Sequence, residues 1–115
     1  MDKAKRSFVI NVLRRGSYKW YGRWQAEKRS KLARNEYYCE NSVCGVIGPK
    51  RNYQMDHIIP VQAVTGFDSI DNIADRMYCD PVGFQRLCKE CHAEKTAAEN
   101  ALRPAGQRKG RKKKQ

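Results

Sequence analysis

The chain has 115 residues and a formal net charge of +12, with 40% hydrophobic and 31% charged residues. This length allows one domain with a limited hydrophobic core, and the absence of any apolar run of about 18 residues excludes a membrane-spanning helix. The basic N-terminus has too short an apolar part for a signal peptide. We therefore expect a cytoplasmic protein that makes no membrane contact and whose five cysteines stay reduced.

In chain order, the pattern predicts helices and short strands separated by loops. The predicted elements are a helix capped by Ser7 and ending at Gly16, an aromatic connector over 17–24, a basic helix from Trp24 or Gln25 to Arg34, strands at 37–39 and 53–61, a helix capped by Asp68 or Ser69 and running through Met77, a strand over 84–87, and a helix over 90–102.

The positive charge is concentrated at the two ends. Residues 1–35 contain 11 basic and two acidic residues, residues 103–115 contain seven basic residues and no acidic one, and residues 36–102 contain six basic and ten acidic residues. Cationic segments bind polyanions such as DNA because neutralised phosphates release counterions. We therefore divide the chain into a basic N-terminal helical arm packed on the core (1–35), a core (36–102) and a disordered basic tail (103–115). Cationic ends that serve solubility alone are the alternative.

The aromatic connector interleaves aromatic and cationic residues. Its aromatic residues are Tyr18, Trp20, Tyr21 and Trp24. Such a pattern is typical of a surface on which nucleic-acid bases stack. More often such aromatic side chains pack a small core, and at this point both interpretations stay open.

Four cysteines form two pairs with metal-ligand spacing. Cys39 and Cys44 have four residues between them, and Cys88 and Cys91 have two. Each pair allows two thiolates to approach one metal ion from a tight turn, so the four predict a closed, tetrahedral structural zinc site. The alternatives are four reduced, buried cysteines or a redox pair. The fifth cysteine, Cys79, lacks a partner at such a spacing and is predicted to be a small core residue.

The only two histidines stand beside candidate metal-site residues. His57 follows Asp56 directly in the predicted strand, and His92 follows Cys91. Neighbours on a strand point to opposite faces, so Asp56 and His57 reach one site only if a bulge or the end of the strand redirects one of them.

With these residues in place, the chain resembles the HNH endonuclease family, a branch of the ββα-metal nucleases. The resemblance covers about residues 8–102 and rests on DHIIPV (56–61), FQRLCKECHAEKT (84–96), Cys39 and Cys44, with LRRGSYKWYGR (13–23) and DRMYCDP (75–81) resembling small phage-type members. It implies an α+β fold: a ββα-metal core with zinc-stapled knuckles and N-terminal helices.

The resemblance also implies roles for the residues between the two histidines. It makes His57 the general base that activates water, and Asp56 and His92 the ligands of a catalytic divalent cation, which is Mg²⁺ or else Mn²⁺ or Ni²⁺. The family's middle residue, commonly asparagine, falls on Gly83. A neighbour such as Gln85 or Asn72 could replace it, backbone contacts could suffice, or activity is weakened.

These expectations lead to a metal-dependent DNA endonuclease that nicks one strand or cuts both. The candidate phosphate contacts are Arg14, Arg15, Arg23, Arg86, Lys89 and Lys95. The resemblance suggests phage DNA as the substrate, with a terminase or another packaging protein as partner. The alternatives are a noncatalytic, zinc-stapled nucleic-acid-binding module and a protein that recruits a partner.

Overall fold

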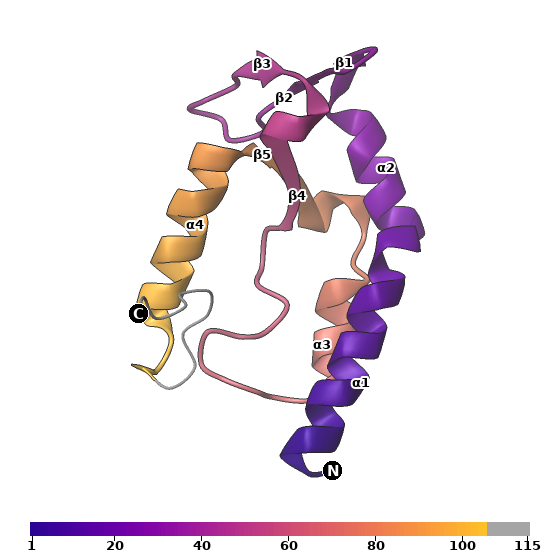
Figure 1. The fold of residues 1–115 in the computed structure, drawn as a ribbon, viewed down its shortest axis with the longest axis vertical. Coiled ribbons are helices and arrows are strands. Elements are labelled where there is room, and N and C mark those ends of the chain that lie inside the picture. The colour runs from indigo at the N-terminus through magenta and orange to yellow at the C-terminus, as the bar shows by residue number, and fades with distance from the viewer. Residues whose placement is uncertain (106–115) are drawn as a thin grey trace, which may run out of the picture.

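The structure, a computed structural model, describes residues 1–105 and is a mixed α+β fold (Figure 1). The helices are α1 (Lys3–Gly16), α2 (Tyr21–Arg29), α3 (Ile70–Met77) and α4 (Lys89–Leu102), with 3-10 turns η1 (Ser17–Lys19), η2 (Lys50–Asn52) and η3 (Pro81–Gly83). The strands are β1 (Lys31–Ala33), β2 (Glu36–Tyr38), β3 (Ile47–Gly48), β4 (Tyr53–His57) and β5 (Phe84–Cys88). No helix in the described part is long and apolar enough to cross a membrane.

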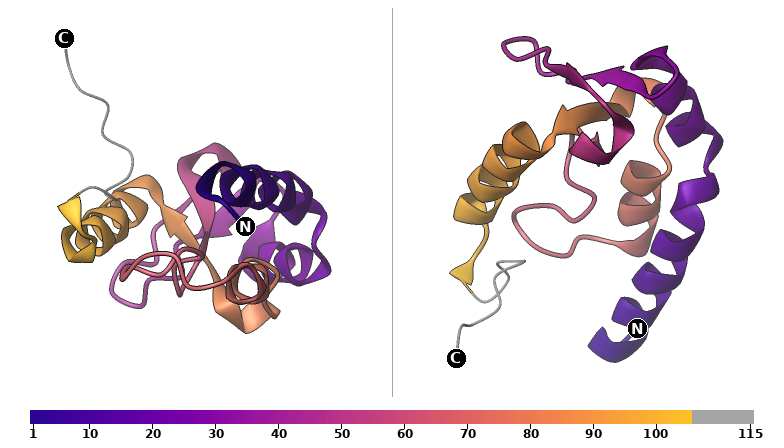
Figure 2. Two further views of the ribbon diagram at one scale, coloured as in Figure 1. Left: turned by 90° about the horizontal axis from the view of Figure 1, so that it is seen from below. Right: turned by 45° about the horizontal axis from the view of Figure 1, so that its top comes forward.

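The strands form two small antiparallel sheets. Strands β1, β2 and β3 form one sheet in that order, and β4 pairs with β5 in the other. Helices α1 and α2 follow each other along one side of the molecule, and α4 lies on the opposite side, with β4 and β5 between them (Figures 1 and 2). Because α4 begins directly after β5, its first turn lies beside the paired strands.

Two separate hydrophobic clusters hold these elements together. The first consists of Tyr37, Cys39, Tyr53, Leu87 and Cys88 and joins the two sheets. The second consists of Ile10, Val61, Ile73 and Met77 and joins α1 to α3. Neither cluster is large, as expected for a chain in which charged residues are so frequent.

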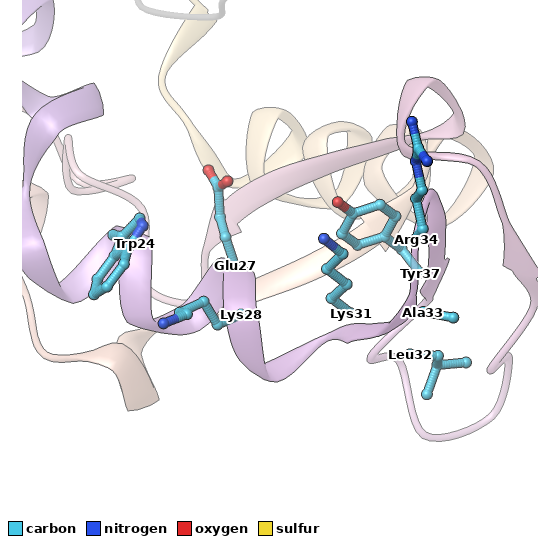
Figure 3. Close-up of a pocket in the computed structure, with 8 residues that line it drawn as sticks. All are labelled: Trp24, Glu27, Lys28, Lys31, Leu32, Ala33, Arg34 and Tyr37. Carbon is cyan, nitrogen blue, oxygen red and sulfur yellow. The ribbon is translucent and has the colours of Figure 1, made fainter.

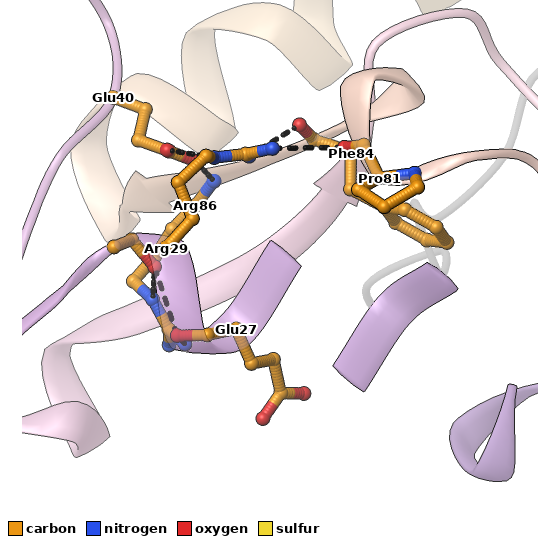
Figure 4. Close-up of polar contacts among 7 residues, drawn as sticks. Glu27, Arg29, Glu40, Pro81, Phe84 and Arg86 are labelled. Atoms are coloured by element: carbon orange, nitrogen blue, oxygen red, sulfur yellow. Dashed lines mark hydrogen bonds and ion pairs between the residues drawn. The ribbon is translucent and has the colours of Figure 1, made fainter. Parts of the chain in front are cut away.

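A polar network ties α2 to β5 (Figure 4). The Arg29 guanidinium donates to both carboxylate oxygens of Glu40, at 2.7 and 2.8 Å, and to the carbonyls of Pro81 and Phe84. Glu40 also accepts a hydrogen bond of 2.7 Å from the backbone N–H of Arg86. Burial alone would raise the pKa of Glu40, but the bonds from Arg29 and Arg86 outweigh it, so the pKa is lowered and the carboxylate stays charged.

The loop that follows β4 is fixed by a clamp at the start of α3. Of the two caps that the sequence predicts, Asp68 and Ser69, it is Ser69 that caps this helix, by accepting a hydrogen bond of 3.0 Å from the N–H of Asn72. Asp68 and Arg76 form a bidentate pair with both distances at 2.9 Å, and Arg76 Nε donates to the carbonyl of Val61. The clamp therefore sets the path of the chain beyond His57.

Several predicted boundaries are wrong. The first helix is capped by Asp2, so Ser7 lies inside it. The second helix begins at Tyr21 and ends at Arg29 instead of Arg34, since Ser30 is fully buried and the next residues form β1. The strand predicted to reach residue 61 ends at His57.

The predicted tail begins too early. Arg103 is buried, and its guanidinium donates to the carbonyls of Gln62 and Ala63. The predicted disorder of residues 106–115 lies outside the described residues.

Candidate functional site

The four predicted cysteines converge at one point. Their sulfur atoms all lie within 4.8 Å of one another, and the Cys44 and Cys88 sulfurs are 4.0 Å apart. Thiolates bound tetrahedrally to zinc at about 2.3 Å are about 3.8 Å apart, so only a small contraction separates this cluster from a zinc site. The group could therefore hold a metal ion, and its all-sulfur donor set is compatible with structural zinc.

Backbone and side-chain N–H groups point at these sulfurs. The N–H of Cys88 lies 3.4 Å from the sulfur of Cys39, and the amide of Asn41 lies 3.4 Å from that of Cys91. Burial raises the pKa of Cys39, but bonds from the backbone N–H groups of Cys88 and Asn41 and from the neighbouring thiols outweigh it, and the net pKa is lowered. The Asn41 bond lowers the pKa of Cys91, yet the neighbouring sulfurs raise it to about 12. The N–H groups around the four sulfurs thus favour the thiolate form, and a bound cation would relieve the repulsion among the thiolates.

Asp56 and His92 come together beside this cluster. Asp56 is the last but one residue of β4, and His92 lies in the first turn of α4. Asp56 Oδ1 is 3.7 Å from His92 Nε2, and both side chains are largely buried. This separation allows the two atoms to contact the same cation.

The second oxygen of Asp56 already has a cationic neighbour within the chain. Lys95 Nζ lies 2.9 Å from Asp56 Oδ2, donates to the carbonyl of His57 at 2.9 Å, and pairs with Glu99. Asp56 Oδ2 is buried and, in the described part of the chain, has no aligned hydrogen-bond donor, so Lys95 supplies charge without good directionality. Lys95 is thus a counterion of two carboxylates, those of Asp56 and Glu99. The sequence predicted neither this role of Lys95 nor the presence of Glu99 in the site.

His57 reaches the same cavity because β4 ends there. The cavity, of about 310 Å³, is lined by residues from α1, β4, the following loop and α4, among them Arg14, Asp56, His57, His92, Lys95 and Glu99. The His57 ring packs on Phe84 with the ring centres 4.7 Å apart, and its Nε2 lies 2.9 Å from the carbonyl of Met77. A carbonyl only accepts, so Nε2 carries the proton and Nδ1 is left with the lone pair.

Burial keeps the His57 imidazole neutral. It lowers the pKa of His57, and the bond to the Met77 carbonyl and the charge of Asp56 offset this only in part. The ring is therefore neutral at pH 7, with Nδ1 free to accept a proton.

Gly83 braces the turn after His57 through its backbone. Its carbonyl accepts a hydrogen bond of 2.9 Å from the N–H of Ile58, which prolongs the pairing of β4 with β5 by one residue. Asn72 bonds to Asp68 and Ser69 instead, so it does not supply the missing asparagine.

The space beside Gly83 is filled by Cys79. A Cβ atom at position 83 would lie 2.5 Å from the Cys79 sulfur, well inside contact distance. We expect Gly83→Ala to lower the free energy of unfolding by about 1–3 kcal/mol. Cys79→Ala should recover part of this loss, because it removes the clashing sulfur. A denaturant-based double-mutant cycle in which the two effects simply add would contradict this packing.

The predicted phosphate contacts differ in accessibility. Arg86 is only 2% exposed: its guanidinium bonds to Ser30 Oγ at 2.6 Å and stacks on Tyr37, so it is structural and its assignment as a phosphate contact is wrong. Arg14 lines the cavity of His57, whereas Arg23 pairs with Glu27. Arg15 and Lys89 are exposed.

Compared with protein-family models, curated proteins and solved structures, the chain has no match in any of the three. The assignment of function therefore depends on the geometry of the site.

Proposed function

We propose that the protein is a metal-dependent DNA endonuclease of the HNH type. The observation that carries the proposal is the convergence of Asp56, His57 and His92 on one cavity, from a strand end and a helix start that are separate in sequence. A neutral base beside a carboxylate–imidazole pair is an arrangement suited to phosphodiester hydrolysis.

In this proposal each residue has one task. His57 accepts a proton from water at Nδ1, while the Met77 carbonyl holds Nε2–H and so fixes both tautomer and ring. Asp56 and His92 hold the divalent cation, which when bound stabilises negative charge on the phosphate. Arg14, on the wall of the cavity, is placed to contact the DNA backbone.

The four-cysteine group has a different task in the proposal. Its ligands, Cys39, Cys44, Cys88 and Cys91, take a structural zinc ion that leaves no position open for substrate. Cys91 is followed directly by His92, and Cys88 ends β5 and caps α4. The zinc site therefore sets where His92 enters the cavity.

Lys95 should compete with the divalent cation for Asp56. Replacing it with methionine removes the ammonium and leaves Asp56 and Glu99 without this counterion, so we expect Mn²⁺ to bind at least about tenfold more tightly. Electron paramagnetic resonance titration of Mn²⁺ into the zinc-loaded protein measures this directly. Lys89→Met, an exposed change on the same helix, is the matched control. Equal Mn²⁺ affinities for Lys95→Met and the wild type would show that Lys95 and the cation do not share a site.

Conversion of supercoiled plasmid to open circles with Mg²⁺, Mn²⁺ or Ni²⁺ tests the proposal. The alternative is a noncatalytic nucleic-acid-binding module, which the exposed cations of the N-terminal arm would also serve. A protein that retards DNA in a gel but never nicks it, with any of the three ions, supports that alternative.

A further inference from the structure

Three of the four aromatic residues of the connector do not pack a core. Tyr18, Tyr21 and Trp24 are 66, 62 and 52% exposed, and each contacts another ring or a cation at the surface. A short chain with two small cores leaves this much aromatic surface in water at a cost in hydrophobic free energy. Such exposure points to a binding partner.

The side of this surface that contains Trp24 is hollowed into a groove of about 550 Å³ between α2 and the β1–β2 hairpin (Figure 3). We call it the α2–β1 groove. Among the residues that line it are Trp24, Lys28, Lys31, Leu32, Arg34 and Tyr37. The groove shares no lining residue with the cavity of His57. The lining of the groove comes from α2 and the β1–β2 hairpin, whereas that of the cavity comes from α1, the end of β4, the following loop and α4 with Arg103.

Charge and shape select the occupant of the α2–β1 groove. Lys28, Lys31 and Arg34 supply three positive charges, and the carboxylate that lines it, Glu27, is paired with Arg23 at 3.3 Å and faces Lys50 at 3.9 Å. The Lys28 ammonium lies 4.1 Å from the centre of the Trp24 ring. An aromatic platform edged by cations matches a polymer with flat bases and a phosphate backbone.

We propose that the α2–β1 groove binds a single strand of nucleic acid, with an unpaired base stacked on Trp24 and phosphates held by Lys31 and Arg34. Duplex DNA hides the faces of its bases, so it cannot use Trp24 in this way. This inference rests on the proposed function only in taking nucleic acid as the partner. The groove is a site for the strand outside the hydrolytic cavity.

The tryptophan itself reports on binding. Of the two tryptophans, Trp20 donates its indole N–H to the carbonyl of Cys79 at 2.6 Å and packs against Tyr78, whereas Trp24 is half exposed. Stacking of a base on Trp24 should quench its fluorescence, and a short oligothymidine is the probe. Quenching that is unchanged in Trp24→Ala would overturn the proposal.

Binding is measured by fluorescence anisotropy in a His57→Ala background without added divalent cation, so that cleavage plays no part. We expect Trp24→Ala to weaken oligothymidine binding at least about fivefold, the lower limit for loss of one stacked base, and to leave duplex binding unchanged. Trp24→Phe should bind nearly as the wild type does. Phe8→Ala, a change at another exposed aromatic residue, on α1, is the control.

The cations have their own test. Lys31→Gln and Arg34→Gln should each lower the salt dependence of oligothymidine binding by about 0.7 in log–log slope, whereas Lys5→Gln on α1 should not. Equal losses of single-strand and duplex affinity in Trp24→Ala would overturn the assignment to unpaired strands. Salt slopes for Lys31→Gln and Arg34→Gln that equal the wild-type slope would overturn the assignment of these two residues to phosphates. Plasmid nicking by Trp24→Ala, measured in parallel with His57 intact, separates failure of this inference from failure of the proposed nuclease.

Discussion

Replacing Cys88 with serine is expected to give a chain that neither retains zinc nor unfolds cooperatively. Cys88 contributes to the four-sulfur group, ends β5, caps α4 and belongs to the first hydrophobic cluster. A structural zinc site in a small domain contributes roughly 10–16 kcal/mol, which is as large as the whole stability of a typical domain. Serine does not replace a thiolate ligand, so the remaining three sulfurs would lose the ion.

The matched control is the fifth cysteine. Cys79 lies outside the four-sulfur group, and serine is no larger than the side chain it replaces. Cys79→Ser should keep its zinc, measured by metal analysis of the purified protein, and should melt cooperatively. A Cys88→Ser protein with a normal melting curve would contradict a structural role for the metal.

Replacing His57 with alanine is expected to reduce the rate of DNA cleavage about 10²- to 10⁴-fold. The physical reason is the loss of the Nδ1 lone pair, which in the proposal accepts the proton from water in the cavity that also contains Asp56 and His92. DNA affinity should be almost unchanged, because His57 is uncharged and binding is dominated by cations. Single-turnover cleavage and gel-shift titration measure the two quantities separately.

A loss of folding must be separated from a loss of chemistry in this variant. The His57 ring packs on Phe84, so alanine leaves a small cavity there. His57→Gln, which fills more of that volume but is no base near neutral pH, should be as inactive as alanine. Substantial cleavage by His57→Gln would assign proton transfer to another group.

The zinc-type cluster was predictable because close cysteine pairs leave few geometries open. The prediction that Cys39 and Cys44 meet Cys88 and Cys91 is confirmed at the level of a four-cysteine group that could hold a metal ion. The helix that begins after Ser69 was also predictable, with its cap narrowed to Asp68 or Ser69, since cap and apolar spacing are both local.

The errors arose where tertiary contacts outweigh local pattern. Lys31–Ala33 continue a plausible helix in sequence, but pairing of β1 with β2 and the buried Ser30 end α2 at Arg29. Arg86 looks like a surface cation in sequence, yet it lies on β5 between Ser30 and the Tyr37 ring. No periodicity reports such distant partners.

In the site, too, local features were predictable from the sequence and tertiary contacts were not. Adjacency predicted that Asp56 and His57 need a strand end to share a cavity, and β4 does end at His57. The counterion role of Lys95 and the presence of Glu99 depend on how α4 packs against β4, which one sequence does not specify. The Gly83–Cys79 contact was hidden for the same reason.

The most direct measurement of the central claim is nicking of supercoiled plasmid by the zinc-loaded wild type beside His57→Ala. With Mg²⁺, Mn²⁺ or Ni²⁺ added, we predict open circles from the wild type, none without a divalent cation, and almost none from His57→Ala. Binding without nicking by the wild type in every metal, or equal nicking by both proteins, would contradict the assignment of His57 and its cavity as a hydrolytic site.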